Sequence, residues 1–508
     1  MIVDALRQLP PLLASHVLLS AAAIGLGLAI SLPLGVVAAR REGVGRWVLG
    51  FAALVQTIPG LALLALFYPL LLGLSALVGG GIPALGFLPS LLALTLYALL
   101  PILRNLVAGL RGIDPAVARA ADGIGMTPGQ KLRLVEAPLA APVAMAGIRT
   151  AAVWTIGAAT LSTTVGQPGL GNLIFAGLQT ENWVLVLTGC IAAALLALTV
   201  DGLLALVESG IAARRRGRIL FAGIALALGV AAAAAPALLP SRPTVTIGAK
   251  NFSEQYILAR LIGARLERAG YAVTYAEGLG SAVAFRALAS GDVDIYVDYS
   301  GTVFGTVMGR TDRLPREAMN AAIAGWMRET SGAVVLGPLG FENAYALAMR
   351  GDRARELGIG SIADLARGAP GLTLGSDLEF LDRPEWRAIR DGYGLRFAGT
   401  RSYSPAFMVR ALTSGQADVI SAFSSDGRIA AEKLVVLADP KGAVPGYDAL
   451  LLLSARRAAE PRFRAALEPL VGAIPVEAMR EANLMVDRDT DKRSPIDAAG
   501  WLAARIGR

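Results

Sequence analysis

Residues 214 to 243 read RRRGRILFAGIALALGVAAAAAPALLPSRP. The stretch has a basic start, an apolar run and small residues near its end, which is the pattern of a secretory signal peptide. It lies in the middle of the chain, with more than two hundred residues on either side. The segment therefore marks a boundary, and the sequences before and after it decide what it does.

The two sides of this segment differ in composition. The chain of 508 residues is 55% hydrophobic and 17% charged, with a mean hydropathy of +0.56. Residues 1–243 hold 15 Lys+Arg against 8 Asp+Glu, whereas residues 244–508 hold 32 against 31. The basic residues of the first half cluster between apolar runs, which is not the pattern of a nucleic-acid-binding surface. We therefore expect no nucleic-acid partner.

The first half contains six apolar stretches that are long enough to cross a ~30 Å hydrocarbon core, which takes about 20 helical residues. They lie near 14–38, 48–72, 83–103, 140–165, 183–207 and 219–239. Because backbone polar groups in lipid must pair internally, we predict six transmembrane helices. The opening segment is then the sixth crossing, and cleavage by a signal peptidase in Ala-rich 231–237 stays open as an alternative.

The charges between these stretches alternate. Basic residues follow the first, third and fifth stretches, whereas the connections after the second and fourth carry no arginine. Arg-rich connections stay in the cytoplasm, so the N-terminus and residues 244 onward are expected outside. Arg149 falls within the fourth stretch, where a charge is costly, so it is either functional or a sign that the membrane span begins later, nearer Thr150, and we favour the later start. These features predict a multi-pass protein of the bacterial plasma membrane, in contact with lipid.

The connection between the third and fourth stretches, residues 112–138, reads GIDPAVARAADGIGMTPGQKLRLVEAP. It is polar, helical in propensity and broken at Gly125 and near Pro128. Asp114 before Pro115 predicts a helix cap. From the residues alone, an amphipathic connector and a docking loop are both consistent with this pattern.

This loop resembles the cytoplasmic coupling loop of ATP-binding-cassette (ABC) importer permeases, whose pattern is Glu-Ala-Ala, three residues, Gly, nine residues, then Ile-x-Leu-Pro. The matching positions are Arg119, Ala120, Ala121, Gly125, Val135, Glu136, Ala137 and Pro138. Arg119 replaces the leading Glu and Ala137 replaces the Leu, so the salt bridge that relatives form with the ATPase through that Glu is not implied here. The resemblance implies two short helices that dock on a separate ATPase subunit, and a homodimer that presents two such loops.

The chain carries no nucleotide-binding motif of its own. A phosphate-binding loop needs Gly-x4-Gly-Lys-Ser/Thr, and none of the five lysines is followed by Ser or Thr. ATP hydrolysis is therefore expected on another chain, and this chain is not expected to be an enzyme. With one cysteine, Cys190, and one histidine, His16, we expect no disulfide framework, metal site or cofactor. We interpret His16 as a helix-end residue.

After the sixth stretch, short β-rich runs alternate with helical ones. They are TVTIGA, a helix from Ser253, YAVTYA, a helix from Ser281, and DVDIYVDY. Both serines are expected N-caps. A second α/β unit runs from near Tyr345 to near Tyr447, after which residues 448–508 are mainly helical. Chain that leaves one lobe and returns to it predicts two α/β lobes with a ligand in the cleft.

Motifs in this half resemble the substrate-binding proteins for glycine betaine, choline and carnitine, which serve osmoprotectant importers. The motifs are IGAKNFSEQYILARLI at 247–262, EGLGSAVAFRAL at 277–288, SGDVDIYVDYSGT at 290–302, FLDRPEWRAIRDGYGL at 380–395, SAFSSDGRI at 421–429 and ADPKGAVPGYDAL at 438–450. The first half resembles the permease of the same importers. Fused permease and binding domains occur in this family, including among importers of ergothioneine, another trimethylammonium betaine.

The resemblance implies an α-helical membrane permease domain with six transmembrane helices, followed by a two-lobed α/β periplasmic-binding-protein fold. The expected parts are a permease at 1–218, a sixth helix and linker at 219–243, and a binding domain at 244–508. Lobe 1 would comprise about 244–340 and 448–508, and lobe 2 about 345–440.

A quaternary ammonium group cannot donate a hydrogen bond, so aromatic faces must recognise it, each worth roughly 0.5 to 2 kcal/mol when desolvated. By motif match, the family's aromatic cage corresponds to Tyr299, Tyr345, Phe423 and Tyr447. Relatives commonly carry Tyr at the position of Phe423. The substitution keeps the ring and removes a hydroxyl, so it affects the choice among ligands more than the cation class.

A betaine also carries a carboxylate, which needs charge-assisted donors. Lys250, Thr302 and Arg383 match the family's carboxylate-binding positions, and Arg383 can hold both oxygens as a fork. Asn343 is a further polar candidate. Choline has no carboxylate and would be repelled by Lys250 and Arg383, which favours betaines.

The sequence therefore predicts the fused permease and binding subunit of an importer that takes up a glycine betaine-type quaternary ammonium compound. Ergothioneine, choline and carnitine are alternative substrates. A membrane receptor for the same ligand is a different class of function, but it needs a cytoplasmic effector, and the inner side here has only short loops. An enzyme in the second half lacks any Cys, His or nucleophile–base pair.

Overall fold

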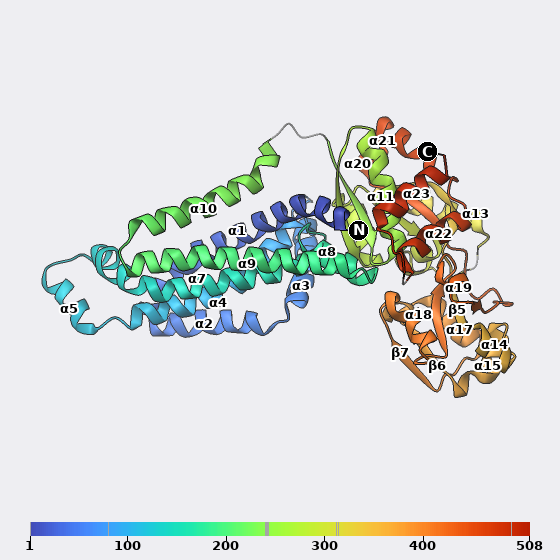
Figure 1. The fold of residues 1–508 in the computed structure, drawn as a ribbon, viewed down its shortest axis with the longest axis horizontal. Helices are drawn as coiled ribbons and strands as arrows, with labels where there is room; N and C mark the ends of the chain where they lie inside the picture. Colours follow the sequence, from blue (N-terminus) through green and yellow to red (C-terminus); the bar gives the residue numbers. More distant parts are fainter. Residues whose placement is uncertain are drawn as a thin grey trace. The chain divides into compact units, whose positions relative to one another are not determined.

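The computed structural model describes residues 2–79, 81–238, 243–310, 312, 314–488 and 490–507. The chain divides into two compact units (Figure 1). One is helical and comprises Ala5–Ile174 and Leu187–Ser241. The other comprises Arg242–Arg508 together with Met1–Asp4 and Phe175–Val186. Residues 239–242 of the predicted linker lie outside the described part of the chain.

Long apolar helices make up the first unit. They are α1 (Ile2–Arg40), α2 (Glu42–Thr57), α3 (Gly60–Leu77), α4 (Phe87–Arg111), α7 (Ala137–Ala158), α8 (Gly171–Gln179), α9 (Trp183–Ala212) and α10 (Arg216–Ala234). In the described residues, six helical segments are long and apolar enough to cross a membrane. The prediction of six such helices is confirmed.

The second predicted stretch, 48–72, is wrong as a single helix. The chain leaves α2 after Thr57, passes through extended backbone at Ile58 and Pro59, and enters α3 at Gly60. Proline disfavours the helical conformation in the residue before it, here Ile58, and has no N–H to donate, so the helix ends at Thr57.

Arg149 lies in the middle of α7, a helix that begins at Ala137, well before Thr150. Its Nε and Nη2 atoms bind the two carboxylate oxygens of Asp201 on α9, each at 2.9 Å, and its Nη1 donates to Glu208 at 2.8 Å. Two carboxylates therefore compensate the charge, so the helix can continue through it.

His16 is not a helix-end residue either. It lies well inside α1, fully buried, with Nε2 2.9 Å from the carbonyl oxygen of Ile156 and Nδ1 3.4 Å from the backbone nitrogen of Leu170. Its ring joins α1 to the end of α7 and to the turn before α8.

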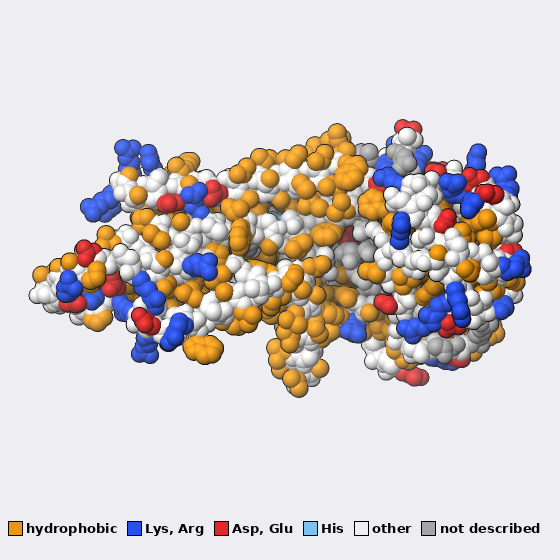
Figure 2. Space-filling view, turned by 90° about the horizontal axis from the view of Figure 1, so that it is seen from below, with side chains coloured by type: hydrophobic (Ala, Val, Ile, Leu, Met, Phe, Trp, Pro, Cys, Tyr) orange, Lys and Arg blue, Asp and Glu red, His pale blue; other side chains and the backbone are white. Residues whose placement is uncertain are grey.

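Small residues let α4 and α7 pack closely. A Cβ on Gly147 would lie 2.5 Å from the carbonyl oxygen of Pro101, and one on Gly109 would lie 3.0 Å from that of Ala140. Close backbone approach through small residues is typical of helix contacts in membranes. Large hydrophobic side chains cover the outside of the helices, while Lys and Arg gather toward the end that carries α5 (Pro115–Gly123) (Figure 2).

Two five-stranded sheets form the second unit. The first has the order β2-β1-β3-β10-β4 and the second β7-β6-β8-β5-β9. The strands are β1 (Thr244–Lys250), β2 (Ala272–Leu279), β3 (Ile295–Tyr299), β4 (Val334–Glu342), β5 (Tyr345–Arg350), β6 (Thr373–Ser376), β7 (Gly399–Ser402), β8 (Val419–Phe423), β9 (Leu434–Val436) and β10 (Asp448–Leu453). Both sheets mix parallel and antiparallel pairs.

Each sheet with its helices is one lobe. Lobe 1, around the first sheet, carries α11 (Ser253–Arg268), α12 (Ser281–Ser290), α13 (Arg316–Ser331), α20 (Ala455–Ala458), α21 (Pro461–Leu467), α22 (Val476–Asp487) and α23 (Pro495–Arg505). Lobe 2, around the second sheet, carries α14 (Gly351–Leu357), α15 (Ile362–Gly368), α16 (Leu378–Asp382), α17 (Pro384–Tyr393), α18 (Pro405–Thr413) and α19 (Arg428–Ala431). The predicted alternation of strands and helices between 244 and 299 is confirmed.

The chain crosses between lobes at two adjacent places. It leaves lobe 1 after β4 and returns before β10, and the backbone N–H of Asn343 in the first crossing donates to the carbonyl of Tyr447 in the second at 2.9 Å. Paired crossings of this kind form a hinge beside the cleft.

The two predicted N-caps in lobe 1 are wrong. Phe252 and Gly280 occupy the cap positions, and neither gives a side-chain cap. The serine hydroxyls donate instead to carboxylates distant in sequence: Ser253 to Asp487, and Ser281 to Glu379. Tertiary partners have replaced the local capping interaction.

Candidate ligand cavity and coupling loop

All eight residues predicted to bind ligand line one cavity of about 530 Å³. They are Lys250, Tyr299, Thr302, Asn343, Tyr345, Arg383, Phe423 and Tyr447. Strand ends deliver four of the eight: β1 ends at Lys250, β3 at Tyr299 and β8 at Phe423, whereas β5 begins at Tyr345. Both lobes contribute, so the cavity is the cleft between them.

Aromatic rings form a continuous group along this cavity. The Tyr345 ring centroid lies 4.9 Å from that of Phe423 and 5.7 Å from that of Tyr447, the second pair edge to face. Phe380 packs 4.9 Å from Tyr345 on its other side. The structure therefore brings three of the four predicted cage rings into direct contact.

The fourth ring joins the group through Phe252, which the sequence reasoning missed. Phe252 stacks on Phe423 at 5.5 Å and on Tyr299 at 6.2 Å. It lies two residues after Lys250 in the first binding-protein motif, and an aromatic residue so close to a predicted site residue was the signal that could have found it.

The cage tyrosines are held by buried carboxylates. The Tyr299 hydroxyl donates to Glu254 at 2.5 Å, and the Tyr447 hydroxyl donates to Glu385. Burial, followed by the charge of these carboxylates, holds the pKa of Tyr299 and Tyr447 well above the ordinary value. Both phenols therefore stay neutral, and each ring keeps a fixed face toward the cavity.

A glycine makes room for one of these rings. A Cβ built on Gly301 would lie 2.5 Å from two carbons of the Tyr447 ring. No side chain fits there without moving the ring, so Gly301 fixes how closely Tyr447 packs against the end of β3.

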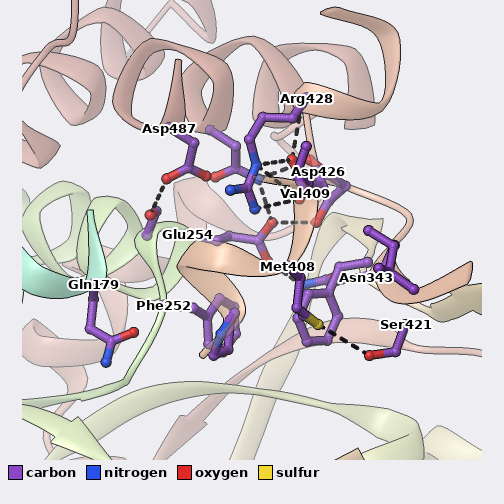
Figure 3. A pocket seen from close by; sticks show the side chains of 17 residues that line it. Gln179, Phe252, Glu254, Asn343, Met408, Val409, Ser421, Asp426, Arg428 and Asp487 are labelled. Carbon is purple, nitrogen blue, oxygen red and sulfur yellow. Dashed lines mark hydrogen bonds and ion pairs between the residues drawn. The ribbon is translucent and has the colours of Figure 1, made fainter. Parts of the chain in front are cut away.

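Glu254 lines the smaller cavity shown in Figure 3, which shares Phe252 and Phe423 with the ligand cavity. Its carboxylate is 2% exposed and accepts hydrogen bonds from Tyr299, Asn343, Ser425 and Asn483. Burial raises the pKa of Glu254, and these donors oppose the rise. Since the donors come from both lobes and the crossing between them, Glu254 ties the hinge to the cage.

The predicted carboxylate-binding side chains lie beside the rings in the same cavity. Lys250 forms a buried ion pair with Asp298, Nζ to Oδ1 at 2.6 Å, and its Nζ lies 4.8 Å from the centre of the Tyr299 ring. Arg383 lies 5.0 Å from the centre of the Tyr345 ring. The two cations therefore border the ring group directly.

Arg383 has partners from both lobes. Its Nη1 donates to Thr302 at 3.2 Å and to Thr306 at 3.4 Å, and its Nη2 donates to Glu379 at 2.6 Å. Its Nε is buried and has no hydrogen-bond partner among the described residues. A buried donor without a partner is costly, and an oxygen atom of a ligand would satisfy it.

Glu379 is the second residue that the sequence reasoning missed. Its Oε1 accepts from Arg383 and, at 2.7 Å, from Ser281 of lobe 1. The pair with Arg383 spans four positions across the end of α16, a spacing at which opposite charges commonly meet. Each predicted clamp cation thus already has a carboxylate partner, which weakens the argument that these cations would repel choline.

The loop predicted to couple to an ATPase consists of short helices at the end of the helical unit. They are α5, α6 (Pro128–Lys131) and a π-helical turn at Leu132–Glu136. Asp114 caps α5 as predicted, accepting from the backbone N–H of Ala116 at 2.8 Å. Gly125, between the helices, has a φ of +78°, a conformation that favours glycine.

Of the other predicted loop residues, Arg119, Ala120 and Pro138 are exposed and Ala121 is buried. Apolar side chains beside them face outward: Ile124 is 74% exposed and Leu134 is 65% exposed. An exposed apolar surface rimmed by polar residues is typical of a docking site for another protein.

Comparison with known families covers both units. Residues 243–504 match the family "Substrate binding domain of ABC-type glycine betaine transport system", which is more than half of the chain. Residues 31–213 match the family "Binding-protein-dependent transport system inner membrane component".

Curated relatives carry the same parts. An ergothioneine transport permease/ergothioneine binding protein of Helicobacter pylori is 28% identical over 89% of this chain and 82% of its own length. A choline transport system permease protein of Bacillus subtilis is 41% identical over 38% of this chain and 83% of its own length. An osmoprotectant import permease protein of Salmonella typhimurium is 42% identical over 37% of this chain and 85% of its own length.

These relatives are transport proteins rather than enzymes, and the ATPase of such importers is a separate subunit. Within one chain, the permease match covers membrane-length helices and the binding-domain match covers two lobes around an aromatic and charged cavity. The chain therefore belongs to the glycine betaine-type ABC importers, as a fused permease and substrate-binding subunit.

Proposed function

We propose that the cavity binds a small compound that carries both a quaternary ammonium group and a carboxylate, of the glycine betaine type. The observation that carries this proposal is the cluster of aromatic rings directly beside Arg383, whose buried Nε lacks a partner among the described residues. The rings suit a cation that cannot donate hydrogen bonds, and the guanidinium suits a carboxylate.

The charges around the rings also favour a cation. Five carboxylates line the cavity or lie one hydrogen bond behind its lining, against the two cations Lys250 and Arg383. The carboxylates are Glu254, Asp298, Asp377, Glu379 and Glu385. Burial raises the pKa of Glu254 and of Asp377, so the charge of each is reduced, but three carboxylates still outnumber the two cations without them. A bound trimethylammonium group would offset this excess.

Within this proposal, Tyr299, Tyr345, Phe423 and Tyr447 form the cation cage. Lys250, Thr302 and Arg383 hold the carboxylate, and Asn343 positions the cage through Glu254. Residues 244–508 act as the binding domain, with the cleft between its lobes as the ligand site. Closing of the lobes on a ligand would give the permease a signal that the site is filled.

Ergothioneine is the second candidate substrate. The Helicobacter pylori relative named for ergothioneine transport and binding aligns over 89% of this chain, so it shares the fused organisation as well as the sequence. Carnitine and choline stay as further candidates because relatives of the permease carry these names. Lys250 and Arg383 are each paired with a carboxylate, so they should repel choline less than the sequence suggested.

We further propose that the chain forms a homodimer in the lipid of the bacterial plasma membrane, with 244–508 outside and 112–138 in the cytoplasm. The Lys and Arg side chains gathered at one end of the helices support this orientation (Figure 2). The exposed apolar residues Ile124 and Leu134 support docking of the loop on an ATPase subunit.

Titration calorimetry on the full-length chain in lipid nanodiscs tests the substrate proposal. The ligands are glycine betaine, proline betaine, carnitine, choline and ergothioneine. We expect at least one carboxylated trimethylammonium compound to bind, and to bind more tightly than choline. Absence of binding by all five compounds would overturn the proposal.

Replacement of Gly125 tests the coupling role of the loop. Because its φ is positive, Gly125→Val strains the turn between α5 and α6 without touching a neighbour, since nothing lies within 4 Å of an added Cβ. We expect uptake into cells to be lost while the purified chain binds ligand with unchanged affinity. Gly123→Ala, at a helical position with equally open surroundings, is the matched control and should leave uptake intact. Wild-type uptake by Gly125→Val would show that the loop is only a connector.

A further inference from the structure

We infer that Glu379 is an internal occupant of the carboxylate subsite, which a ligand carboxylate must displace, and that it sets the preference between carboxylated and uncarboxylated cations. This inference rests on the proposed function of the cavity. It goes beyond that function because it assigns a role in ligand preference to an acidic residue that lies among the predicted ligand contacts without being one of them.

The position of the Glu379 carboxylate supports the inference. Its Oε1 lies 2.6 Å from Arg383 Nη2 and 2.7 Å from Ser281 Oγ. Ser281 Oγ is also 3.4 Å from Lys250 Nζ, so one carboxylate oxygen engages both cations of the clamp, one directly and one through the serine. These are the donors that a ligand carboxylate would need.

The carboxylate is ionised and able to leave. Burial alone would raise the pKa of Glu379, but the nearby charges of Arg383 and Lys250 outweigh it and lower the pKa. The side chain is 44% exposed, in contrast to the 4% of Arg383. Glu379 can therefore turn toward solvent at modest cost, while Arg383 stays in place.

The contact also joins the lobes. Glu379 lies on α16 of lobe 2, and Ser281 begins α12 of lobe 1. Together with the hydrogen bond from Arg383 to Thr302, the contact between Glu379 and Ser281 bridges the cleft without a ligand. A ligand carboxylate that took the place of Glu379 would keep the bridge to Arg383 and Ser281, so the lobes could stay closed while the occupant changes.

Two classes of ligand should respond to this residue in opposite directions. A carboxylated ligand competes with Glu379 for the same donors and is repelled by its charge. A cation without a carboxylate leaves Glu379 in place and is attracted by it. If Glu379 only held Arg383 in position, its replacement would weaken the binding of carboxylated ligands and would never strengthen it.

The experiment compares Glu379→Gln with Asp382→Asn in the full-length chain in nanodiscs, by calorimetric titration with glycine betaine and with choline. Glu379→Gln keeps the shape and removes the charge. Asp382, exposed at the end of the same helix, gives the same change of charge outside the cavity. For Glu379→Gln we expect glycine betaine to bind about tenfold more tightly and choline about tenfold more weakly, or to fall below detection.

Asp382→Asn should leave both affinities within about twofold of wild type. Glu379→Ala, measured with a thermal melt to establish folding, should show the same opposite shifts. Equal weakening of both ligands in the Glu379 variants would overturn the inference and leave the cavity's proposed function standing. If the wild-type chain binds none of the five compounds, the proposed function is wrong, and the inference that rests on it is wrong as well.

Discussion

Two arginines in this chain each meet carboxylates, yet their surroundings assign them different roles. Arg149, in the membrane-length helices, uses Nε, Nη1 and Nη2 on Asp201 and Glu208. Arg383, in the binding domain, shares Nη1 and Nη2 among several partners and keeps a buried Nε without one. Each side-chain nitrogen of the first arginine has a carboxylate partner, whereas the second arginine keeps one nitrogen without a partner among the described residues.

This difference separates a structural ion cluster from a binding site. The carboxylates of Arg149 come from a neighbouring helix and bind each of its nitrogens, so the cluster holds α7 to α9. Glu379, the partner of Arg383, is partly exposed and lines a cavity, so the pair can open. A buried donor without a hydrogen-bond partner beside a cavity is a better sign of a ligand site than a buried charge alone.

The largest effect is expected from Arg149→Ala. The change leaves Asp201 and Glu208 without their counter-charge in an apolar stretch, at a cost of about 3 kcal/mol and a fall of about 10 °C in the melting temperature in detergent. Ligand affinity should not change. Replacing Arg149, Asp201 and Glu208 together by Leu should recover most of the melting temperature. If Arg149→Ala alone melted at the wild-type temperature, the contrast between the two arginines would not hold.

Arg383→Ala should show the reverse pattern. We expect glycine betaine to bind more weakly by about 1.5 to 3 kcal/mol, the range for a hydrogen bond to a charged group, or roughly 10- to 150-fold. Choline should bind as before or slightly more tightly, because a like charge has gone. The melting temperature should change little, since Glu379 can turn to solvent. Equal losses for the two ligands in calorimetry would contradict the assignment of Arg383 to the carboxylate.

The smallest of the three effects is expected from Tyr447→Ala. Loss of one aromatic face should weaken glycine betaine and choline alike by about 1 to 2 kcal/mol, or roughly 5- to 30-fold. Tyr447→Phe keeps the ring and loses only the hydrogen bond to Glu385, so it should retain most of the affinity. A loss confined to the carboxylated ligand would show that Tyr447 belongs to the clamp rather than to the cage.

The sequence predicted the large elements well because they depend on local pattern. Apolar length identified the six membrane-length helices, and alternating β-rich and helical runs identified the strands and helices of lobe 1. The errors came where a distant partner changes a local preference. Ile156 and Leu170 give His16 partners well inside α1, whereas the single helix expected at 48–72 was wrong because hydropathy alone overlooks a local signal, Pro59.

Motifs placed eight side chains in one cavity but did not identify what already occupies it. The position of Glu379 against Ser281 depends on how lobe 2 meets lobe 1, and their sequence separation of 98 residues gives no local sign of it. Phe252 was within reach of the same reasoning, because it lies inside a quoted motif. Ser253 and Ser281 were mistaken for caps since a hydroxyl that serves a tertiary contact has the same sequence context as one that caps a helix.

The fusion itself has a kinetic consequence. The sixth membrane-length helix and the binding domain belong to one chain, so each permease is made with one binding domain of its own. Covalent linkage raises the effective concentration of two parts that interact, without any new contact between them. Weak docking is then sufficient for delivery, and release after delivery can be fast. Uptake should therefore scale with the number of transporters in the membrane and not with a separate pool of binding protein.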